Sequence, residues 1–565
     1  MSKERNIVVI LLLLILGFNL FYAAYRTVSV DETAYIIQGY LILTKGIFFS
    51  DDTMPFAKVI SGLPLFLLKP NIPSGYYDLY LDNEFMKLGA DFLYKSNSNS
   101  GIMVFFARIF PLLLSLLLGF FVYRWASDLY GTKAGILSLI LYTFSPNILA
   151  ESASATSDLA AVCFMFGSTY FLWRYLKFEK KTDLLVTSLL FGLAQVTKLT
   201  ALLLIPVFVL FLAYPAFKAR SFDKAKKAAI AFAVILVASY IMINMAFLFQ
   251  GTFTPLGKSL ADDPVHYFDK AKFNSESISQ GFPAWARNAG SYYLNNVPTF
   301  IPYPYLKNFM GAVRKYENPI FLGGYLNGKL HENGDNYFYY LENFLLRTPI
   351  ALILLIILSI ALSKKYTDSI GDNIMLLIIP IALFLYFSSG TMWGGIRYLL
   401  PIYPFMFVFV SKLANSREKK IIFPVIALAA WFVMGSILAF PSHPAYFNEA
   451  AIGEGHFFLS GPSFDVGQDL KALGNYAKAN SLKGLKLAYF GEGSPDYYGL
   501  NYSYIAYYGN LKQSVENCSR QEGLVAISIT YLHPTKQLNN PDCFDWLSGY
   551  KPVKKIGNTI FLYEV

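Results

Sequence analysis

Long runs of apolar residues, separated by short segments rich in lysine and arginine, recur over the first three quarters of the chain. The first run covers residues 7–25, and its roughly 19 residues would span about 29 Å as a helix, enough to cross the hydrocarbon core of a bilayer. Hydrophobic residues make up 55% of the 565 residues and charged residues only 15%, whereas a soluble domain has about a quarter charged residues. The sequence therefore predicts a polytopic α-helical membrane protein.

The positions of the basic residues predict the sidedness of the spans. The net charge is +10, with 47 basic and 37 acidic residues, and the basic residues gather in short segments between apolar runs, which is the positive-inside pattern rather than a nucleic-acid-binding surface. The first run is too long for a signal peptide and lacks its cleavage site. We therefore expect about eleven spans in a multi-pass protein of the cell membrane, with the N-terminus inside and the C-terminus outside. The expected spans are 7–25, 102–123, 133–145, 158–174, 184–196, 199–217, 228–249, 349–362, 374–387, 401–412 and 421–440.

The composition changes near residue 440 and predicts two domains. Residues 1–440 form the membrane domain, with long outer loops at 26–100 and 250–347. Residues 441–565 read as an extracytoplasmic α/β domain, because amphipathic and strand-like patterns replace the long apolar runs. Its expected elements are a helix over 466–479, strands over 485–490 and 524–529, and a hairpin over 553–556 and 559–563.

The three cysteines and five histidines leave the redox state open and give no metal motif. Cys163 lies in an apolar run and is expected to be a core residue. Cys518 and Cys543 either form one disulfide, if the C-terminal domain is outside the cytoplasm, or remain two thiols. The histidines show no spacing typical of a metal site.

Few ionisable residues lie at the predicted outer ends of the spans, and they include both signs. They are Asp31, Glu32, Arg108, Asp158, Lys198 and Arg397. Transfer of a group from a lipid phosphate to a hydroxyl needs such a mixture, because a carboxylate accepts the proton of the hydroxyl and cations stabilise the departing phosphate. The apolar surface between the spans would hold the lipid tail.

Each of these residues also has a structural alternative. Asp31 and Glu32 would alternatively be a hydrated interfacial pair, and Asp158 would cap a helix. Arg108 and Lys198 would be snorkelling side chains. Three further residues near the last membrane exit would either line the site or dock the outer domain. These are His443, Glu449 and Asp465.

Several short segments, taken in order, resemble one family. They are VDET at 30–33, ARI at 107–109, SPNILAESASATSD at 145–158, TKLTAL at 197–202, GIRYLLP at 395–401, FDVGQDL at 464–470, YFG at 489–491 and PDYYG at 495–499. The set is similar to the GT-C membrane glycosyltransferases, in the branch of protein O-mannosyltransferases and the lipid A aminoarabinose transferase.

The resemblance implies an inverting transfer of a monosaccharide from a polyprenyl- or dolichyl-phosphate donor. Asp31 would be the base and Glu32 would orient it, while Arg397, with Arg108 or Lys198, would meet the phosphate. Asp158 and Tyr398 complete the expected substrate site. The acceptor (a protein, lipid or glycan hydroxyl) and the need for a divalent cation stay open, and the rival hypothesis is a transporter or flippase of lipid-linked sugars.

Overall fold

The computed structural model describes residues 2–49, 53–82, 84–261, 296–315, 323–331, 333–334, 336–366, 370–459, 464–509, 512–515, 518–533 and 542–565. In these residues, seven helices are long and apolar enough to cross a membrane, or eight if one bent pair counts as a span. The seven are α1 (Ser2–Tyr25), α6 with α7 (Ser100–Ala107 and Ile109–Tyr130), α10 (Asp158–Phe178), η3 with α12 (Leu199–Leu203 and Leu204–Ala219), α13 (Phe222–Ala246), α21 (Ile370–Ser388) and α23 (Lys419–Ala439).

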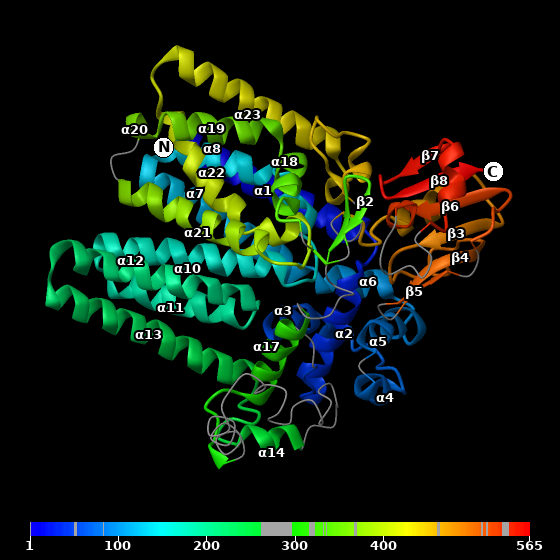
Figure 1. Cartoon of the computed structure of the whole chain (residues 1–565), viewed down its shortest axis with the longest axis horizontal. Helices are drawn as coiled ribbons and strands as arrows, with labels where there is room; N and C mark the ends of the chain where they lie inside the picture. The colour runs from blue at the N-terminus through cyan, green and yellow to red at the C-terminus, as the bar shows by residue number, and fades with distance from the viewer. Residues whose placement is uncertain are drawn as a thin grey trace.

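Shorter helices occupy the remaining predicted spans. They are α8 (Thr132–Thr143), α11 (Lys181–Gln195), α22 (Ile402–Ser411) and α19 (Ile350–Ala361), which meets α18 (Tyr339–Arg347) at a bend of 106°. Each of the eleven predicted spans therefore falls on a helix, of which seven or eight are long and apolar enough to cross a membrane, and the polytopic helical fold is confirmed. The helices run side by side in one bundle (Figure 1).

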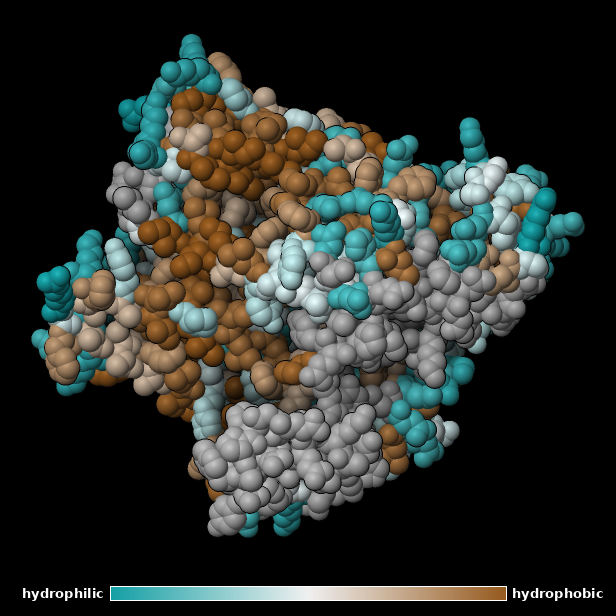
Figure 2. Space-filling view, in the orientation of Figure 1, coloured by the Kyte–Doolittle hydropathy of each residue, from teal (hydrophilic) through white to brown (hydrophobic). Residues whose placement is uncertain are grey.

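The surface of the bundle is apolar where a membrane would contact it. Phe217 on α12 and Leu438 on α23 are 84% and 76% exposed, and hydrophobic residues cover the visible faces of α21 and α23, with hydrophilic residues at the helix ends (Figure 2). The interior is packed with aromatic rings instead, such as Trp125 against Phe166 with 5.0 Å between ring centroids. This distribution is typical of a multi-pass membrane protein.

Short helices of the first outer segment lie beside the bundle and below the C-terminal sheet in the view of Figure 1. They are α2 (Val30–Lys45), α3 (Pro55–Gly62), η1 (Leu63–Leu67), α4 (Tyr76–Leu81), α5 (Phe85–Ala90) and a short π-helix (Asp91–Lys95). Helices α2 and α3 pack closely at Gly39, where a Cβ would lie 1.8 Å from the carbonyl oxygen of Lys58.

The predicted outer loop 250–347 lies partly outside the described residues. Its described part contains α14 (Leu256–Ala261), α17 (Tyr303–Lys315) and the strands β1 (Gly324–Leu326) and β2 (Lys329–His331).

The C-terminal residues form a six-stranded sheet in the order β5-β4-β3-β6-β8-β7. Strand β3 pairs in parallel with β4 and β6, and the other pairs are antiparallel. The strands are β3 (Leu485–Tyr489), β4 (Tyr502–Gly509), β5 (Lys512–Val515), β6 (Leu524–Ser528), β7 (Lys554–Ile556) and β8 (Ile560–Glu564). The predicted strands and hairpin are confirmed, whereas β4 and β5 were not expected.

The predicted helix of this region begins later than expected. Helix α24 covers Leu470–Ala479, so residues 466–469 are not helical, and their backbone contacts other segments instead.

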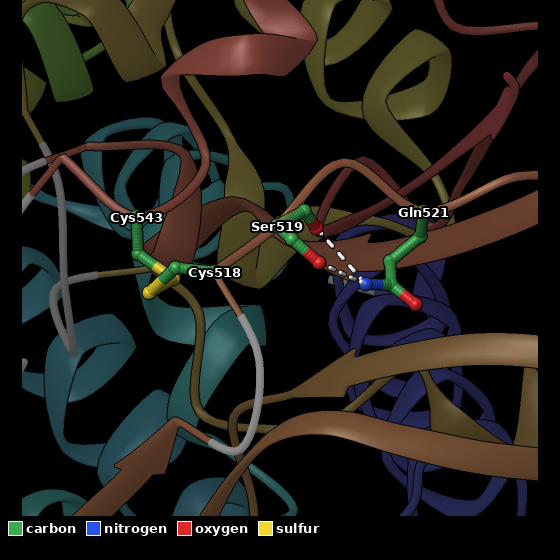
Figure 3. The surroundings of a disulfide bond; sticks show 4 residues. All are labelled: Cys518, Ser519, Gln521 and Cys543. Carbon is green, nitrogen blue, oxygen red and sulfur yellow. Dashed lines mark hydrogen bonds between the residues drawn. A yellow bond between two sulfur atoms is a disulfide. The ribbon is translucent and has the colours of Figure 1, made fainter.

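Cys518 and Cys543 form a disulfide beside Ser519 and Gln521 (Figure 3), with 4.8 Å between the Cα atoms. Of the two alternatives that the sequence left open, the structure has the bridged one.

Candidate active site

The acidic motif lies at the start of α2, directly after the chain leaves α1. Asp31 and Glu32 occupy the first helical turn, where the unpaired backbone N–H groups of a helix favour negative charge. The backbone N–H of Ser29 donates to Glu32 Oε2 at 2.8 Å. This bond fixes the Glu32 carboxylate, and because successive residues are rotated by about 100° around a helix, the side chains of Asp31 and Glu32 point in different directions.

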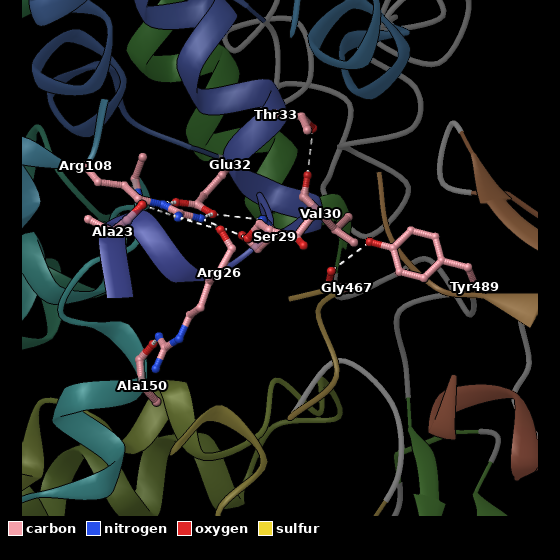
Figure 4. Close-up of polar contacts among 12 residues, drawn as sticks. Ala23, Arg26, Ser29, Val30, Glu32, Thr33, Arg108, Ala150, Gly467 and Tyr489 are labelled. Carbon is pink, nitrogen blue, oxygen red and sulfur yellow. Dashed lines mark hydrogen bonds and ion pairs between the residues drawn. The ribbon is translucent and has the colours of Figure 1, made fainter. Parts of the chain in front are cut away.

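Glu32 points into the protein and pairs with Arg108. Arg108 donates from Nε to Oε1 at 2.7 Å and from Nη2 to Oε2 at 2.6 Å, and both side chains are 1% exposed (Figure 4). The backbone N–H of Ala155 donates to Oε1 at 2.7 Å. Burial by itself would raise the pKa of Glu32, but the charge of Arg108 and these hydrogen bonds outweigh it and lower the pKa, so Glu32 is ionised.

The remaining donors of Arg108 bind the end of α1 and the segment after it. They bind the carbonyl oxygens of Ala23, Arg26 and Thr27 at 3.0–3.1 Å. All five N–H groups of the guanidinium are thus occupied, which leaves none for a phosphate in this arrangement. Arg108 is neither snorkelling nor hydrated; it binds the acidic motif to the bundle.

Asp31 points the other way and pairs with Arg397. Arg397 Nη1 donates to Asp31 Oδ2 at 2.7 Å, and the two side chains are 23% and 37% exposed. Arg397 is in η5 (Ile396–Leu399), after Gly394 and Gly395. A Cβ on Gly394 would lie 1.6 Å from the ring of Tyr398, and Gly395 has a φ of +71°, so the glycines allow the turn that presents Arg397 and Tyr398 together.

A second ion pair joins Lys198 and Asp158. Asp158 is the first residue of α10, Lys198 precedes η3, and Lys198 Nζ binds Asp158 Oδ1. Lys198 Nζ also lies 4.9 Å from the ring centroid of Tyr398, and the Arg397 guanidinium lies 5.8 Å from the same centroid. Tyr398 therefore joins the two ion pairs into one cluster, in which both cations are within cation–π distance of one ring.

The cluster brings together five of the seven predicted site residues. Burial would lower the pKa of Arg397, but Asp31 and Asp158 outweigh this and raise it well above its usual value, so its charge is permanent. Two carboxylates face two cations, and the four side chains balance in charge. Glu32 and Arg108 form a separate, fully buried pair behind Asp31.

Glu151 joins this cluster, although the sequence did not single it out. It ends α9 (Pro146–Glu151) and has intermediate exposure. Burial first, and then the charge of Asp158, raise the pKa of its carboxyl to about 7, against the effect of Arg397 and Arg26. Arg26 fixes the end of α9 by donating to the carbonyl oxygen of Ala150 at 2.7 Å (Figure 4).

Glu151 was missed because its neighbours are distant in sequence. The available signal was its position as a second acid in the predicted outer loop that ends at Asp158. Among the described residues, no three His, Cys, Asp or Glu side chains gather in a group that could hold a metal ion.

Residues 100–243 match the family described as dolichyl-phosphate-mannose-protein mannosyltransferase. This part of the chain contains Arg108, Asp158 and Lys198. The match confirms, over these residues, the resemblance that the short motifs predicted. A search of curated proteins finds no match.

Three solved structures are similar to the whole fold or most of it. ArnT from Cupriavidus metallidurans bound to undecaprenyl phosphate is 11% identical, with a TM-score of 0.49 over 98% of this chain and 97% of that one. The protein O-mannosyltransferase Pmt1-Pmt2 complex of S. cerevisiae bound to the sugar donor is 12% identical, with a TM-score of 0.48 over 78% and 89%. The oligosaccharyltransferase AglB from Archaeoglobus fulgidus is 13% identical, with a TM-score of 0.45 over 76% and 55%. At these values the similarities assign no activity and no residue role to this chain.

Proposed function

We propose that the protein is an inverting membrane glycosyltransferase. It moves a monosaccharide from a polyprenyl- or dolichyl-phosphate donor to a hydroxyl group of an acceptor. The observation that carries the proposal is the cluster around Tyr398, in which Asp31 pairs with Arg397 beside Asp158 and Lys198. The family description matched by residues 100–243 supports a lipid-phosphate-linked donor.

When the donor binds, its phosphate would replace a carboxylate as the partner of Arg397 and Lys198. A phosphate oxygen binds Arg397 and Lys198, as guanidinium and ammonium groups bind phosphates in proteins. Asp31 then loses part of its ion pair and becomes a stronger proton acceptor. The partial exposure of Asp31, Arg397 and Lys198 leaves these groups accessible to a ligand.

The transfer exchanges one bond to the anomeric carbon for another. The acceptor oxygen attacks from the face opposite the phosphate, and its proton passes to Asp31. The bond from the anomeric carbon to the phosphate oxygen breaks, and the polyprenyl phosphate leaves with the electron pair, stabilised by Arg397 and Lys198. The products are the glycoside and polyprenyl phosphate, and the anomeric centre is inverted.

Glu32 and Arg108 have a different role in this proposal. Because every N–H group of Arg108 is occupied, we assign the phosphate contact to Arg397 and Lys198. Glu32 orients the helical turn that carries Asp31. Asp158 holds Lys198 near the ring of Tyr398 until the donor arrives.

We place the reaction on the outer face of the membrane. The basic segments between the spans favour an inside position for the opposite ends of the helices, and a disulfide is typical of an oxidising compartment outside the cytoplasm. The acceptor is defined here only by its hydroxyl group.

The proposal is tested with purified protein and a panel of polyprenyl-phosphate-linked monosaccharides. A membrane extract supplies acceptors, and the release of polyprenyl phosphate is measured with and without a chelator, which also tests the divalent cation that the resemblance leaves open. We expect release from one donor and a new glycoside of inverted configuration. A transporter would instead move the donor between leaflets of a vesicle with no release, and that result would contradict the proposal.

A further inference from the structure

One segment of the C-terminal region lies between its sheet and the acidic motif. We call residues 464–469 the docking segment. At its start, Asp465 Oδ2 accepts a hydrogen bond from Thr530 Oγ1 at 2.8 Å. At its end, Asp469 Oδ2 accepts one from Thr559 Oγ1 at 2.6 Å. Both carboxylates are buried, and Thr530 lies just after β6 and Thr559 just before β8, so the segment is attached at two points at the ends of strands.

Tyr489 attaches the middle of the docking segment. Tyr489 ends β3, is 1% exposed, and donates from its hydroxyl to the carbonyl oxygen of Gly467 at 2.7 Å (Figure 4). Gly467 has a φ of +82°, and a Cβ there would lie 2.7 Å from the Tyr489 hydroxyl and 2.8 Å from the Cα atom of Gly491. Only glycine therefore fits this turn without displacing the sheet.

The opposite edge of the docking segment contacts the residues just before Asp31. The backbone N–H of Thr27 donates to the carbonyl oxygen of Gln468 at 3.0 Å, and that of Val30 donates to the carbonyl oxygen of Val466 at 3.1 Å. The backbone N–H of Lys471, at the start of α24, donates to Thr27 Oγ1 at 2.8 Å. The chain from Thr27 to Val30 is thus bound by the C-terminal region.

The same short stretch is bound from the bundle side by Arg108, which donates to the carbonyl oxygen of Thr27 at 3.0 Å. Residues 27–30 therefore lie between two fixed partners, and Asp31 follows directly. A displacement of about 1 Å in a reacting group can reduce the rate about 100-fold. Because Asp31 follows this stretch directly, the attachment of residues 27–30 determines where its carboxylate lies, and a small shift of these residues would lower the rate.

We propose that the C-terminal domain positions the catalytic carboxylate of Asp31. Tyr489 is the positioning residue, and it acts through Gly467 and the docking segment. The inference rests on the proposed function for its catalytic meaning. Tyr489 itself touches no reacting group. Its effect passes through the carbonyl oxygen of Gly467 to the backbone contacts with Thr27 and Val30.

The test compares Tyr489→Phe with Tyr563→Phe. Both tyrosines are buried in the same sheet, and among the described residues Tyr563 makes no hydrogen bond to the docking segment. Each substitution removes one hydroxyl and keeps the ring. We expect Tyr489→Phe to lower kcat about tenfold or more, with the donor KM within twofold of the wild type. Tyr563→Phe should match the wild type.

Hydrogen exchange gives a second readout that does not depend on activity. In Tyr489→Phe the amides of Thr27 and Val30 should exchange faster than in the wild type, while the thermal midpoints of the two variants stay close to each other. Unchanged exchange at these amides, or an equal loss of kcat in Tyr563→Phe, would overturn the inference. If wild-type protein releases no polyprenyl phosphate from any donor, the proposed function fails, and the catalytic role of the segment fails with it. The exchange result then still decides whether the docking exists.

Discussion

At the scale of single residues, the two adjacent acids of the motif serve different ends. Glu32 is buried and bidentate with Arg108, whereas Asp31 is partly exposed and faces Arg397. Removing one partner of a buried ion pair costs about 3–5 kcal/mol, because the other charge is left uncompensated. An ion pair between exposed side chains contributes only about 0–1 kcal/mol to the free energy of unfolding.

This difference gives a matched pair of stability predictions. Arg108→Gln should lower the free energy of unfolding by about 3–5 kcal/mol. Arg124→Gln in α7 removes an i,i+4 pair with Asp128, in which Arg124 is 43% exposed, and should change it by less than about 1 kcal/mol. Thermal midpoints in detergent measure both. Equal midpoints for the two variants would contradict the role of Arg108 in fixing the motif.

Glu151 predicts a pH dependence of donor binding. Burial and Asp158 raise the pKa of its carboxyl from 4.5 to about 7, with Asp31, Arg397 and Arg26 as the other charged neighbours. The folded protein thus retains a proton that the unfolded chain loses, so the contribution of this group to stability is complete below pH 4.5 and is lost as the pH rises through 7. Above pH 7 the added negative charge repels the anionic donor.

We therefore expect the donor KM of the wild type to rise severalfold as the pH increases from 6 to 8, a change of less than about 1 kcal/mol in binding. In Glu151→Gln the side chain stays neutral and the KM should be flat over this range. Steady-state kinetics at fixed ionic strength measure it. A Glu151→Gln profile with the same rise as the wild type would assign the transition to another group.

At the scale of elements, the membrane helices were predicted well because an apolar run bounded by basic residues indicates a span by its composition alone. Strand β4 was missed because the tyrosine-rich sequence 502–509 has no clear alternation of apolar and polar residues, and β5 because Lys512–Val515 is short and mostly polar. The start of α24 was placed too early, because residues 466–469 bond to the sheet and to Thr27 instead of to a helix, a tertiary contact that local propensity does not contain.

The pairing within the site was predicted only in part. The sequence placed Asp31 and Arg397 at the outer ends of their spans, and they are in contact although 366 positions apart. It did not predict the pairing of Arg108 with Glu32, because the direction of each carboxylate depends on the rotational phase of α2. Glu151 was missed because its charged neighbours come from segments that are distant in the sequence.

The disulfide allows a test of the C-terminal region as an element. Cys518 and Cys543 close a loop with a sequence separation of 25, and a bridge over such a loop stabilises a fold by about 3 kcal/mol in the chain-entropy account. The variant with both cysteines replaced by serine should have a lower thermal midpoint and normal transfer at low temperature. Cys163→Ala in the membrane core, where no bridge exists, serves as the control. An unchanged midpoint in the double variant would show that the bridge contributes little.

At the scale of the whole molecule, the bundle, the first outer helix and the docking segment of the C-terminal region meet around residues 27–31. The proposed function needs this point on the outer face. A reporter enzyme that is active only outside the cytoplasm should therefore be active when it is fused after Val565. Thiol reagents applied to intact cells should also reach cysteines introduced in the C-terminal region. Activity of a cytoplasmic reporter at the same position would contradict the orientation.

The assignment of Asp31 as the base is the centre of this account, and Asp31→Asn tests it most directly. Binding of a polyprenyl-phosphate-linked sugar and its single-turnover conversion to polyprenyl phosphate are measured on the same purified protein. We predict that the variant binds the donor as the wild type does or more tightly, because a negative charge beside Arg397 is removed. Release should fall by about 10²–10⁴. Release at the wild-type rate, with donor binding intact, would contradict the account.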